Sequence, residues 1–245
     1  MRIKISFVRD QNSSNSIPLH HQKLLSSALH ELVSSFALEP LPFNFSSIKG
    51  TSRIQNGYMR FLSTKVTMVV SAADADYCNK IVDEIFSRPY LTIGKLNIMP
   101  RFKEIIADPP ITKRMRYICI SPLILFDPKI DQAKAQELIN PNTKEFADAL
   151  YNVVMDQMEK AGYTEEQLAQ YAEFESQPDK EYVEKVQDSG KKFARFYKCS
   201  EGFTMLGYLL PFTLYAHTDV HDFIWKNGIG VLNNEGYGMV DVVTN

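Results

Sequence analysis

The order of hydrophobic patterns along the chain occurs twice, and this repeat limits the fold more than any other feature of the sequence. The first copy predicts a strand, a helix, two strands, a helix and a strand, over residues 1–8, 18–36, 41–45, 61–71, 74–87 and 91–99. Pro18 is expected in the first turn of the first helix, and a polar loop is expected between the two central strands. This order of elements is that of a ferredoxin-like domain.

The second copy follows a connector that Pro109 and Pro110 stiffen. It predicts a strand, a helix, a strand pair, a short helix and a last strand, over residues 116–126, 143–161, 192–198 with 203–215, 219–226 and 237–243. We interpret the acidic, glutamine-rich residues 164–189 as an inserted helix plus linker. The sequence therefore predicts an α+β fold of two tandem ferredoxin-like (RRM-like) domains, residues 1–110 and 111–245.

Charge is distributed unevenly, although the formal net charge is only −2. Residues 1–122 hold 16 Lys and Arg against 9 Asp and Glu, whereas residues 123–188 hold 6 against 15. A basic half can face a polyanion while an acidic segment faces water, because the local field depends on where the charges lie. A solvated acidic helix with scattered surface lysines gives the same distribution, so charge alone leaves both interpretations open.

The cysteines and the apolar segments indicate the compartment. Cys78, Cys119 and Cys199 are odd in number, far apart and without a CxxC pair, which is typical of a reducing cytosol. The N-terminus has the pattern of a strand and lacks an apolar signal region, and the most apolar stretch, residues 117–126, is interrupted by Ser121 and Pro122. We therefore expect a cytoplasmic protein without membrane contact.

Four of the eleven glycines fall in one short element, GIGVLNNEGYG over residues 228–238. Gly228, Gly230, Gly236 and Gly238 permit positive φ and let a backbone come close to a ligand, so that successive N–H groups point at phosphate oxygens. The element follows a helix and precedes a strand, the reverse of a dinucleotide-binding loop, and this excludes that class. A tight connector that binds nothing is the other interpretation of the spacing.

Histidine is the residue type suited to acid–base chemistry near neutral pH, and the chain has five. His21 projects onto the apolar stripe of the first helix and is expected in the core or as a cap. His30 projects roughly opposite, toward solvent or a cleft. HExxH, paired Cys/His clusters and GxSxG do not occur in the sequence, so we predict neither a metal nor a cofactor, and acyl transfer is not indicated.

Four motifs resemble, in order and spacing, the CRISPR-associated repeat-processing endoribonucleases of the Cas-six type. They are IPLHHQKLLSSALHEL, PFNFSSIKG, ISPLILF and GIGVLNNEGYGMV, over residues 17–32, 42–50, 120–126 and 228–240. The resemblance spans nearly the whole chain, and its most specific part is the paired glycine element with Asn233 between the pairs. It implies two ferredoxin-like domains, binding of precursor CRISPR transcripts and one metal-independent cut within each repeat. The implied nucleophile is the 2′-hydroxyl before the scissile phosphate, giving a 2′,3′-cyclic phosphate and a 5′-hydroxyl.

The implied chemistry needs a base for the 2′-hydroxyl proton, an acid for the leaving oxygen and a cation for the phosphorane. Many family members supply a histidine after the first helix, a tyrosine on that helix and a nearby lysine. Here residues 34–42 contain neither histidine nor lysine, so the usual acid–base position is empty. His30 occupies the helix position where some relatives have the tyrosine, and Lys49 and Arg53 are the nearest cations in sequence. These three residues are the catalytic candidates.

The RNA-binding candidates are the glycine element and the basic residues beside the expected strands of the second domain. They are Gly228, Gly230, Asn233, Gly236, Gly238, Lys191, Lys192, Arg195, Lys198, Lys113, Arg114 and Arg116. The expected partner is CRISPR repeat RNA, and the family also allows contact with proteins of a CRISPR effector complex. Both a monomer and a homodimer fit the sequence.

The empty acid–base position keeps two other functions open. One is a family member that holds repeat RNA but cuts it slowly or not at all. The other is an assembly subunit of a CRISPR effector, which reads RNA shape without processing it, although such proteins normally carry longer insertions than this chain has.

Overall fold

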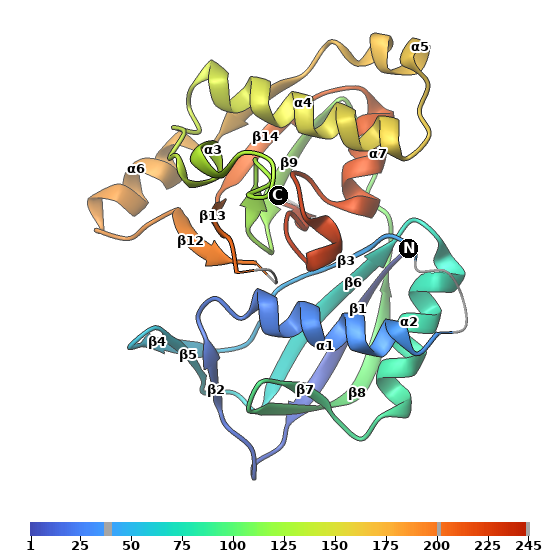
Figure 1. The fold of residues 1–245 in the computed structure, drawn as a ribbon, viewed down its shortest axis with the longest axis vertical. Helices are drawn as coiled ribbons and strands as arrows, with labels where there is room; N and C mark the ends of the chain where they lie inside the picture. Colours follow the sequence, from blue (N-terminus) through green and yellow to red (C-terminus); the bar gives the residue numbers. More distant parts are fainter. Residues whose placement is uncertain (37–40, 200–201, 244–245) are drawn as a thin grey trace. The chain divides into compact units, whose positions relative to one another are not determined.

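The computed structural model describes residues 1–36, 41–199 and 202–243, which form two compact units (Figure 1). The first unit is Met1–Asp108 together with Asn234–Gly236. The second is Pro109–Asn233 together with Tyr237–Asn245. A short piece of the glycine-rich element is therefore part of the first unit, while the residues on both sides of it are part of the second.

The first unit is built on a five-stranded antiparallel sheet in the order β3-β6-β1-β8-β7. Its strands are β1 (Arg2–Arg9), β3 (Phe43–Phe45), β6 (Lys65–Ala72), β7 (Leu91–Ile93) and β8 (Leu96–Ile106). Ile3, Ile5 and Phe7 of β1 share one hydrophobic core with the apolar faces of α1 (Gln22–Ser34) and α2 (Ala75–Ser87). This arrangement is the ferredoxin-like fold that the sequence predicts.

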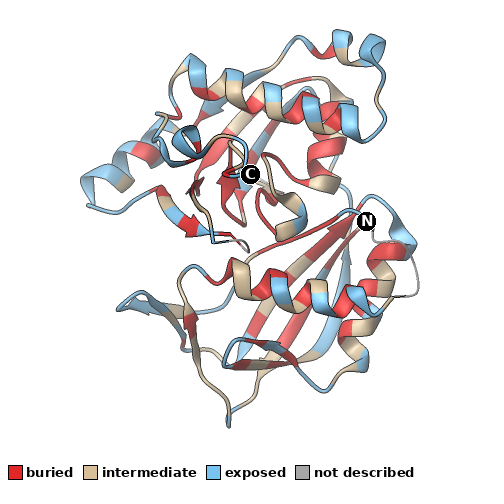
Figure 2. Cartoon of the chain, viewed as in Figure 1, coloured by how far each residue is buried: buried red, intermediate tan, exposed pale blue. Residues whose placement is uncertain are grey.

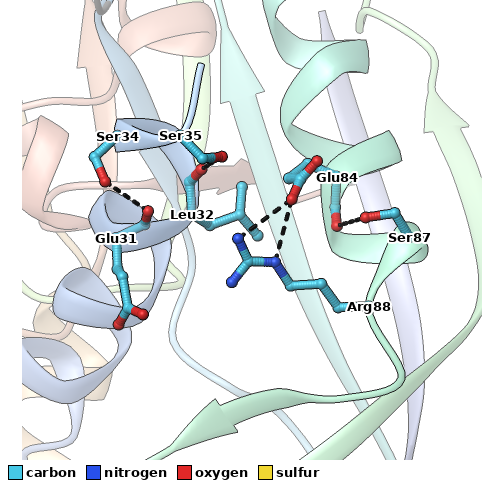
Figure 3. Close-up of polar contacts among 7 residues, drawn as sticks. All are labelled: Glu31, Leu32, Ser34, Ser35, Glu84, Ser87 and Arg88. Atoms are coloured by element: carbon cyan, nitrogen blue, oxygen red, sulfur yellow. Dashed lines mark hydrogen bonds and ion pairs between the residues drawn. The ribbon is translucent and has the colours of Figure 1, made fainter. Parts of the chain in front are cut away.

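Side chains complete the hydrogen bonding at the ends of both helices. Asp74 accepts a hydrogen bond from the Tyr77 amide at 2.6 Å and so caps the first turn of α2. At the other ends, the hydroxyls of Ser34 and Ser87 donate to the carbonyls of Glu31 and Glu84, at 2.7 and 2.8 Å (Figure 3). These bonds satisfy carbonyls that have no partner within the helix.

Two details of the first unit differ from the prediction. Pro18 does not begin the helix; it ends a short strand, β2 (Ser16–Pro18), that pairs with β5 (Tyr58–Phe61). The expected polar loop contains β4 (Ser52–Gln55), which pairs with β5 across a turn at Asn56 and Gly57, both at positive φ. Asn-Gly is the sequence that favours this tight hairpin turn, so the turn signal was present in the chain.

The strand expected at the end of the first unit is a hairpin of two strands, β7 and β8. Gly94, at φ 60°, turns the chain between β7 and β8, and β8 continues to Ile106. The expected single strand over residues 91–99 therefore covers two antiparallel strands and the turn between them.

The second unit repeats the fold of the first. Its four-stranded antiparallel sheet has the order β11-β14-β9-β15, and α4 and α7 share one hydrophobic core with it. The elements are β9 (Arg114–Cys119), α4 (Lys144–Lys160), β11 (Glu175–Pro178), β14 (Pro211–Tyr215), α7 (Thr218–Asn227) and β15 (Val240–Val242). If the β7–β8 hairpin of the first sheet is counted as one strand, both main sheets place their strands, numbered along the chain, in the order second, third, first and fourth.

The second strand of this domain is not where the sequence places it. It is β11, which lies inside the acidic segment 164–189 between α5 (Glu165–Leu168) and α6 (Lys180–Asp188). The expected pair belongs largely to a separate three-stranded sheet, β10-β13-β12, formed by β10 (Leu123–Ile124), β13 (Thr204–Tyr208) and β12 (Ala194–Lys198). The segment 164–189 is thus part of the domain framework as well as helical.

The expected strand over residues 116–126 is divided between these two sheets. β9 ends at Cys119 and β10 begins at Leu123, with Pro122 between them. Proline has no N–H for a sheet ladder, so one continuous pairing cannot pass through it. The side chain of Ser121 instead accepts a hydrogen bond from the Met239 amide at 2.8 Å.

Two buried histidines lie in the cores as neutral rings. His21 Nε2 accepts a hydrogen bond from the Ile48 amide at 3.2 Å, and burial lowers the pKa of His21 to about 4. His221 donates from Nε2 to the Lys113 carbonyl at 3.2 Å and accepts at Nδ1 from the Tyr117 hydroxyl at 2.9 Å. Burial also lowers the pKa of His221.

These histidines predict an acid-labile fold. The unfolded chain binds protons to His21 below about pH 6.5, whereas the folded chain does not until about pH 4, so stability is lost as pH falls through that window. His21 should contribute about 2–3 kcal/mol to the difference in unfolding free energy between pH 7 and pH 4.5. Urea titrations at both pH values should show that His21→Gln reduces this difference. An unchanged difference would show that His21 is not a buried neutral group.

Candidate functional site

The glycine-rich segment 228–238 leaves α7 and leads into β15, and its four glycines adopt conformations that other residues avoid. Gly228, Gly230, Gly236 and Gly238 have φ of 91°, 91°, 82° and 69° and are all buried. A short 3-10 turn, η2 (Asn233–Glu235), lies between the two glycine pairs. The chain therefore makes a compact loop that turns back on itself twice within eleven residues.

The space beside these glycines is filled by the protein itself. A Cβ on Gly238 would meet the Ile229 carbonyl, and a Cβ on Gly230 would meet the Ile124 carbonyl. A Cβ on Gly236 would meet the ring of Phe45 and the amide of Gln22. The sequence predicts that these glycines allow close approach of a ligand, whereas in the structure they allow close approach of the chain's own atoms.

Backbone hydrogen bonds fix the glycine loop within the second unit. The Gly238 amide donates to the Pro122 carbonyl at 2.7 Å, and the Val231 amide donates to the Ile124 carbonyl at 2.9 Å. The Ile229 amide donates to the Gly238 carbonyl at 2.8 Å and closes the loop at its base. The carbonyls that accept hydrogen bonds from the loop amides therefore lie at and just after the break between β9 and β10.

Gln157 of α4 holds the first glycine pair. Its Nε2 donates to the Gly230 carbonyl at 2.5 Å, and its Oε1 accepts from Asn233 Nδ2 at 3.4 Å. Asn233 lies between the glycine pairs in the sequence and is predicted to bind RNA. In the structure its side-chain nitrogen contacts Gln157, and its buried Oδ1 makes no hydrogen bond within the described residues.

Gln22, in the first turn of α1, holds the second glycine pair. Its Nε2 donates to the Gly236 carbonyl at 2.6 Å, and its Oε1 accepts from the Ser47 hydroxyl at 2.9 Å. Both ends of this buried amide are thus satisfied. Within the first unit, the bonds connect Gly236 to the segment after β3, which carries the PFNFSS motif.

His30 is also placed against the glycine loop, two turns further along α1. Its Nε2 lies 2.8 Å from the Asn234 carbonyl, and its ring centroid lies 5.3 Å from that of Phe43. A carbonyl only accepts, so Nε2 carries the proton of this bond, and in a neutral ring Nδ1 then has the lone pair. His30 is partly exposed, so a substrate atom can reach the ring.

Lys49 and Arg53 do not lie beside His30. Lys49 pairs with Thr67 on β6, whereas Phe43, which contacts His30, pairs with Ala72. Five residues along a strand separate the two positions, about 17 Å at about 3.4 Å per residue. Arg53 lies exposed on β4. The structure therefore brings only His30 of the three catalytic candidates to the glycine loop, and residues 37–40 of the segment 34–42 lie outside the described residues.

The basic candidates of the second unit are placed on two sheets. Arg114 and Arg116 share one face of β9, where Arg114 lies 5.6 Å from the Tyr215 ring centroid and Arg116 forms an ion pair with Asp179 at 2.8 Å. The pKa of Asp179 is lowered by a hydrogen bond from the Tyr182 amide and also by Arg116. Lys113 lies 3.7 Å from Glu173. These cations already have protein partners that an RNA phosphate would have to share.

The other basic group lies at and before β12. Lys191, Lys192 and Lys198 are exposed, and Arg195 is partly exposed. Arg195 and Lys198 are three residues apart on a strand, so their side chains point to opposite faces. The expected set of four therefore does not form one continuous track on this strand.

Sequence reasoning missed the two glutamines that hold the loop. Gln157 recurs within the apolar stripe of α4, and Gln22 lies inside the first family-like motif. A single amide in an otherwise apolar helical stripe is a signal that a buried polar group needs a partner. The sequence alone does not show which carbonyl that partner is.

Two absences hold for the part of the chain that the structure describes. No group of three His, Cys, Asp or Glu side chains in residues 1–36, 41–199 and 202–243 comes together to hold a metal ion. Within the same residues, every helix is too short or too polar to cross a bilayer.

The close packing of the glycine loop predicts a steep cost for an added methyl group. Gly238→Ala should lower the unfolding free energy by about 2–5 kcal/mol, because it combines a positive-φ residue with a clash at the Ile229 carbonyl. Gly162→Ala is the matched control, since Gly162 also has positive φ (97°) but no atom within 4 Å of a Cβ. It should cost only about 1–2 kcal/mol. Equal losses in chemical denaturation would show that the loop is not closely packed.

Comparison with known proteins identifies the family of the chain. A family model described as CRISPR associated protein Cas6, C-terminal, matches residues 106–242, more than half of the chain. No curated protein matches the sequence significantly.

Solved structures share the fold over the full length. A Cas6-related protein from Pyrococcus furiosus has a TM-score of 0.79 at 20% identity, covering 100% of this chain and 99% of that one. A RAMP protein that binds different RNA substrates has a TM-score of 0.78 at 19% identity, with 100% of both chains covered. A CRISPR associated protein Cas6 has a TM-score of 0.75 at 18% identity, covering 100% of this chain and 99% of that one. With its two ferredoxin-like domains and the matched C-terminal model, the chain belongs to the CRISPR-associated Cas6 family.

Proposed function

We propose that the chain binds CRISPR repeat RNA and cuts within the repeat without a metal, by attack of a 2′-hydroxyl on the adjacent phosphate. The products are a 2′,3′-cyclic phosphate and a 5′-hydroxyl end, which makes the chain an endoribonuclease of precursor CRISPR RNA. Membership of the Cas6 family supports the substrate, and one solved relative is described as binding different RNA substrates. The observation that carries the proposed chemistry is the position of the His30 ring against the glycine loop.

His30 serves as the proton-transfer group of the proposed reaction. The Asn234 carbonyl holds the Nε2 proton, so the Nδ1 lone pair of the neutral ring is available to take the 2′-hydroxyl proton. As the P–O5′ bond breaks, water gives a proton to the leaving 5′ oxygen, which yields the 5′-hydroxyl. The ring contact with Phe43 restricts how the imidazole turns. A fixed tautomer and a fixed ring plane are what a general base needs, because proton transfer depends on alignment with the substrate hydroxyl.

The cations serve RNA binding in this proposal more than phosphorane stabilisation. Lys49 pairs with β6 about 17 Å along the strand from the Phe43 position, so the proposal does not assign its ammonium to the phosphate at His30. Lys49 and Arg53 then contact other phosphates of the same strand. Arg114, Arg116 and the exposed lysines before β12 extend the phosphate contacts, and the glycine loop positions the reacting segment through His30.

A second function has its own support. His30 Nε2 donates a hydrogen bond to the Asn234 carbonyl of the loop. This bond alone gives His30 a structural role, in which it stabilises the loop and transfers no proton. The chain would then hold repeat RNA without cutting it. This alternative and the nuclease differ in what His30 variants do.

His30 variants test the catalytic role. His30→Ala should slow single-turnover cleavage of the repeat by roughly 10²–10⁴-fold, the usual effect of one positioned proton-transfer group. His30→Gln keeps an N–H for the Asn234 carbonyl but cannot exchange a proton near neutral pH, so it should be equally slow while it binds RNA normally. Recovery of the rate in His30→Gln would assign His30 to loop positioning alone.

The RNA itself tests the nucleophile. Replacing the 2′-hydroxyl before the scissile phosphate by hydrogen should abolish cutting and leave binding largely intact, because one hydroxyl adds little to a backbone-dominated interface. EDTA should leave the rate unchanged, since the proposed base is a side chain. Mapping the ends of the labelled product should show the cyclic phosphate. A wild-type protein that binds its repeat and yields no such product would favour the RNA-holding function.

A further inference from the structure

A small three-stranded sheet in the first unit has one face that the proposed reaction leaves unexplained. Its order is β2-β5-β4, and every pair is antiparallel. Figure 1 shows β4 and β5 extending away from the main sheet of the unit, and Figure 2 shows their surface as largely exposed. The two faces of this small sheet differ in character because side chains alternate along each strand.

The inner face anchors the sheet. Ile17 of β2 and Phe61 of β5 are buried in the core of the first unit. The Phe61 amide donates to the Asn15 carbonyl at 2.9 Å, and the Leu19 amide donates to the Gly57 carbonyl at 2.8 Å. These contacts hold the sheet in place, so its outer face is a fixed surface.

The outer face gathers two arginines and a tyrosine. Arg53 of β4 lies directly opposite Arg60 of β5, and the next pair on the same face is Gln55 with Tyr58. Tyr58 is 52% exposed, and both arginines are exposed. Among the described residues, the side chain of neither arginine makes an ion pair or a hydrogen bond.

Two like charges directly opposite each other destabilise a sheet. Nothing nearby in the sequence offsets them, because residues 46–73 contain Lys49, Arg53, Arg60 and Lys65 and no acidic residue. An anionic ligand that both guanidinium groups contact would remove this repulsion. The charge pattern therefore favours a polyanion as the occupant of this face.

The exposed aromatic ring narrows the ligand class. Proteins bind single-stranded nucleic acid by combining cations that contact the backbone with aromatic rings on which bases stack. We propose that the outer face of β2-β5-β4 is a second, sequence-tolerant site for single-stranded RNA, with Arg53 and Arg60 on phosphates, Tyr58 under a base and Gln55 at a base edge. The site rests on the proposed function only for its source of RNA, a segment of the repeat or its flank away from the cut.

This assignment gives Arg53 a binding role in place of phosphorane stabilisation. Loss of a remote phosphate contact weakens binding but leaves the rate of the bound complex unchanged. Loss of a phosphorane contact lowers that rate even when RNA is saturating. The two roles therefore separate in single-turnover kinetics.

The test uses the full-length protein with two probes, the host repeat RNA and an oligouridine of similar length. Replacing both arginines, Arg53→Gln with Arg60→Gln, should reduce the slope of log affinity against log salt by roughly 1.4 for both probes, at roughly 0.7 per lost contact. Tyr58→Ser should weaken binding by roughly fivefold or more. In single-turnover kinetics at saturating RNA, Arg60→Gln alone and Tyr58→Ser should raise the apparent Kd for the repeat and leave the rate of the bound complex unchanged.

Two control variants match these changes. Ile54→Ser alters a side chain of β4 that is 55% exposed but points to the other face, and it should leave both affinities unchanged. Lys144→Gln with Lys160→Gln removes the same charge from exposed positions of α4 and should leave the salt slope nearly unchanged. Thermal melting should show that every variant stays folded.

The outcomes separate this site from the proposed function. Suppose that the wild-type protein binds oligouridine through Arg53, Arg60 and Tyr58 but never cuts its repeat. This result would support the second RNA site and rule out the nuclease function. If the protein cuts its repeat normally and these variants change neither affinity nor salt slope, the second RNA site is overturned and the nuclease function is supported. No binding of oligouridine by the wild type would also overturn it. Polyglutamate that binds more tightly than oligouridine through the same three residues would also overturn it, because an acidic protein would then be the partner.

Discussion

Close contact between backbones fixes the path of the glycine loop, residues 228–238. Gly230 and Gly238 lie against the carbonyls of Ile124 and Ile229, where a side chain has no room. The loop amides donate to the Pro122 and Ile124 carbonyls, which are accessible because proline ends the ladder of β9. The break between β9 and β10 therefore supplies the carbonyls, and the distant glycine loop supplies the amides that bond to them.

This packing turns the loop's own carbonyls toward side chains. Gln157 donates to the Gly230 carbonyl, and Gln22 donates to the Gly236 carbonyl. His30 makes the corresponding bond to Asn234 between them. A paired glycine motif is usually interpreted as a ligand cradle, but here its first physical role is to build a scaffold. That scaffold places the His30 ring against the Asn234 carbonyl.

The sequence predicts the fold more completely than the site. Apolar residues alternate clearly with polar ones in β1, and they form clear stripes at helical spacing in α1, α2 and α4. The tandem ferredoxin-like architecture follows from these patterns. β11 escapes prediction because Glu175–Pro178 has no apolar alternation; its residues pair by backbone bonds with β14. The contacts of His30, Gln22 and Gln157 with the loop escape it as well. Each joins residues more than seventy positions apart, and no local pattern encodes which carbonyl an amide will meet.

The chemical types of the residues explain why the arginines of the first unit lie apart from the glycine loop. The glycine loop is surrounded by buried groups such as Phe45, where an unpaired ammonium or guanidinium would pay a large desolvation cost. Neutral amides satisfy the loop carbonyls without that cost, and a histidine does the same as a neutral donor while it keeps a second nitrogen for proton transfer. Arg53 and Arg60 instead lie exposed on β4 and β5, where water solvates their guanidinium groups. A chain built this way keeps Arg53 and Arg60 on exposed strands and holds the His30 imidazole against the Asn234 carbonyl of the loop.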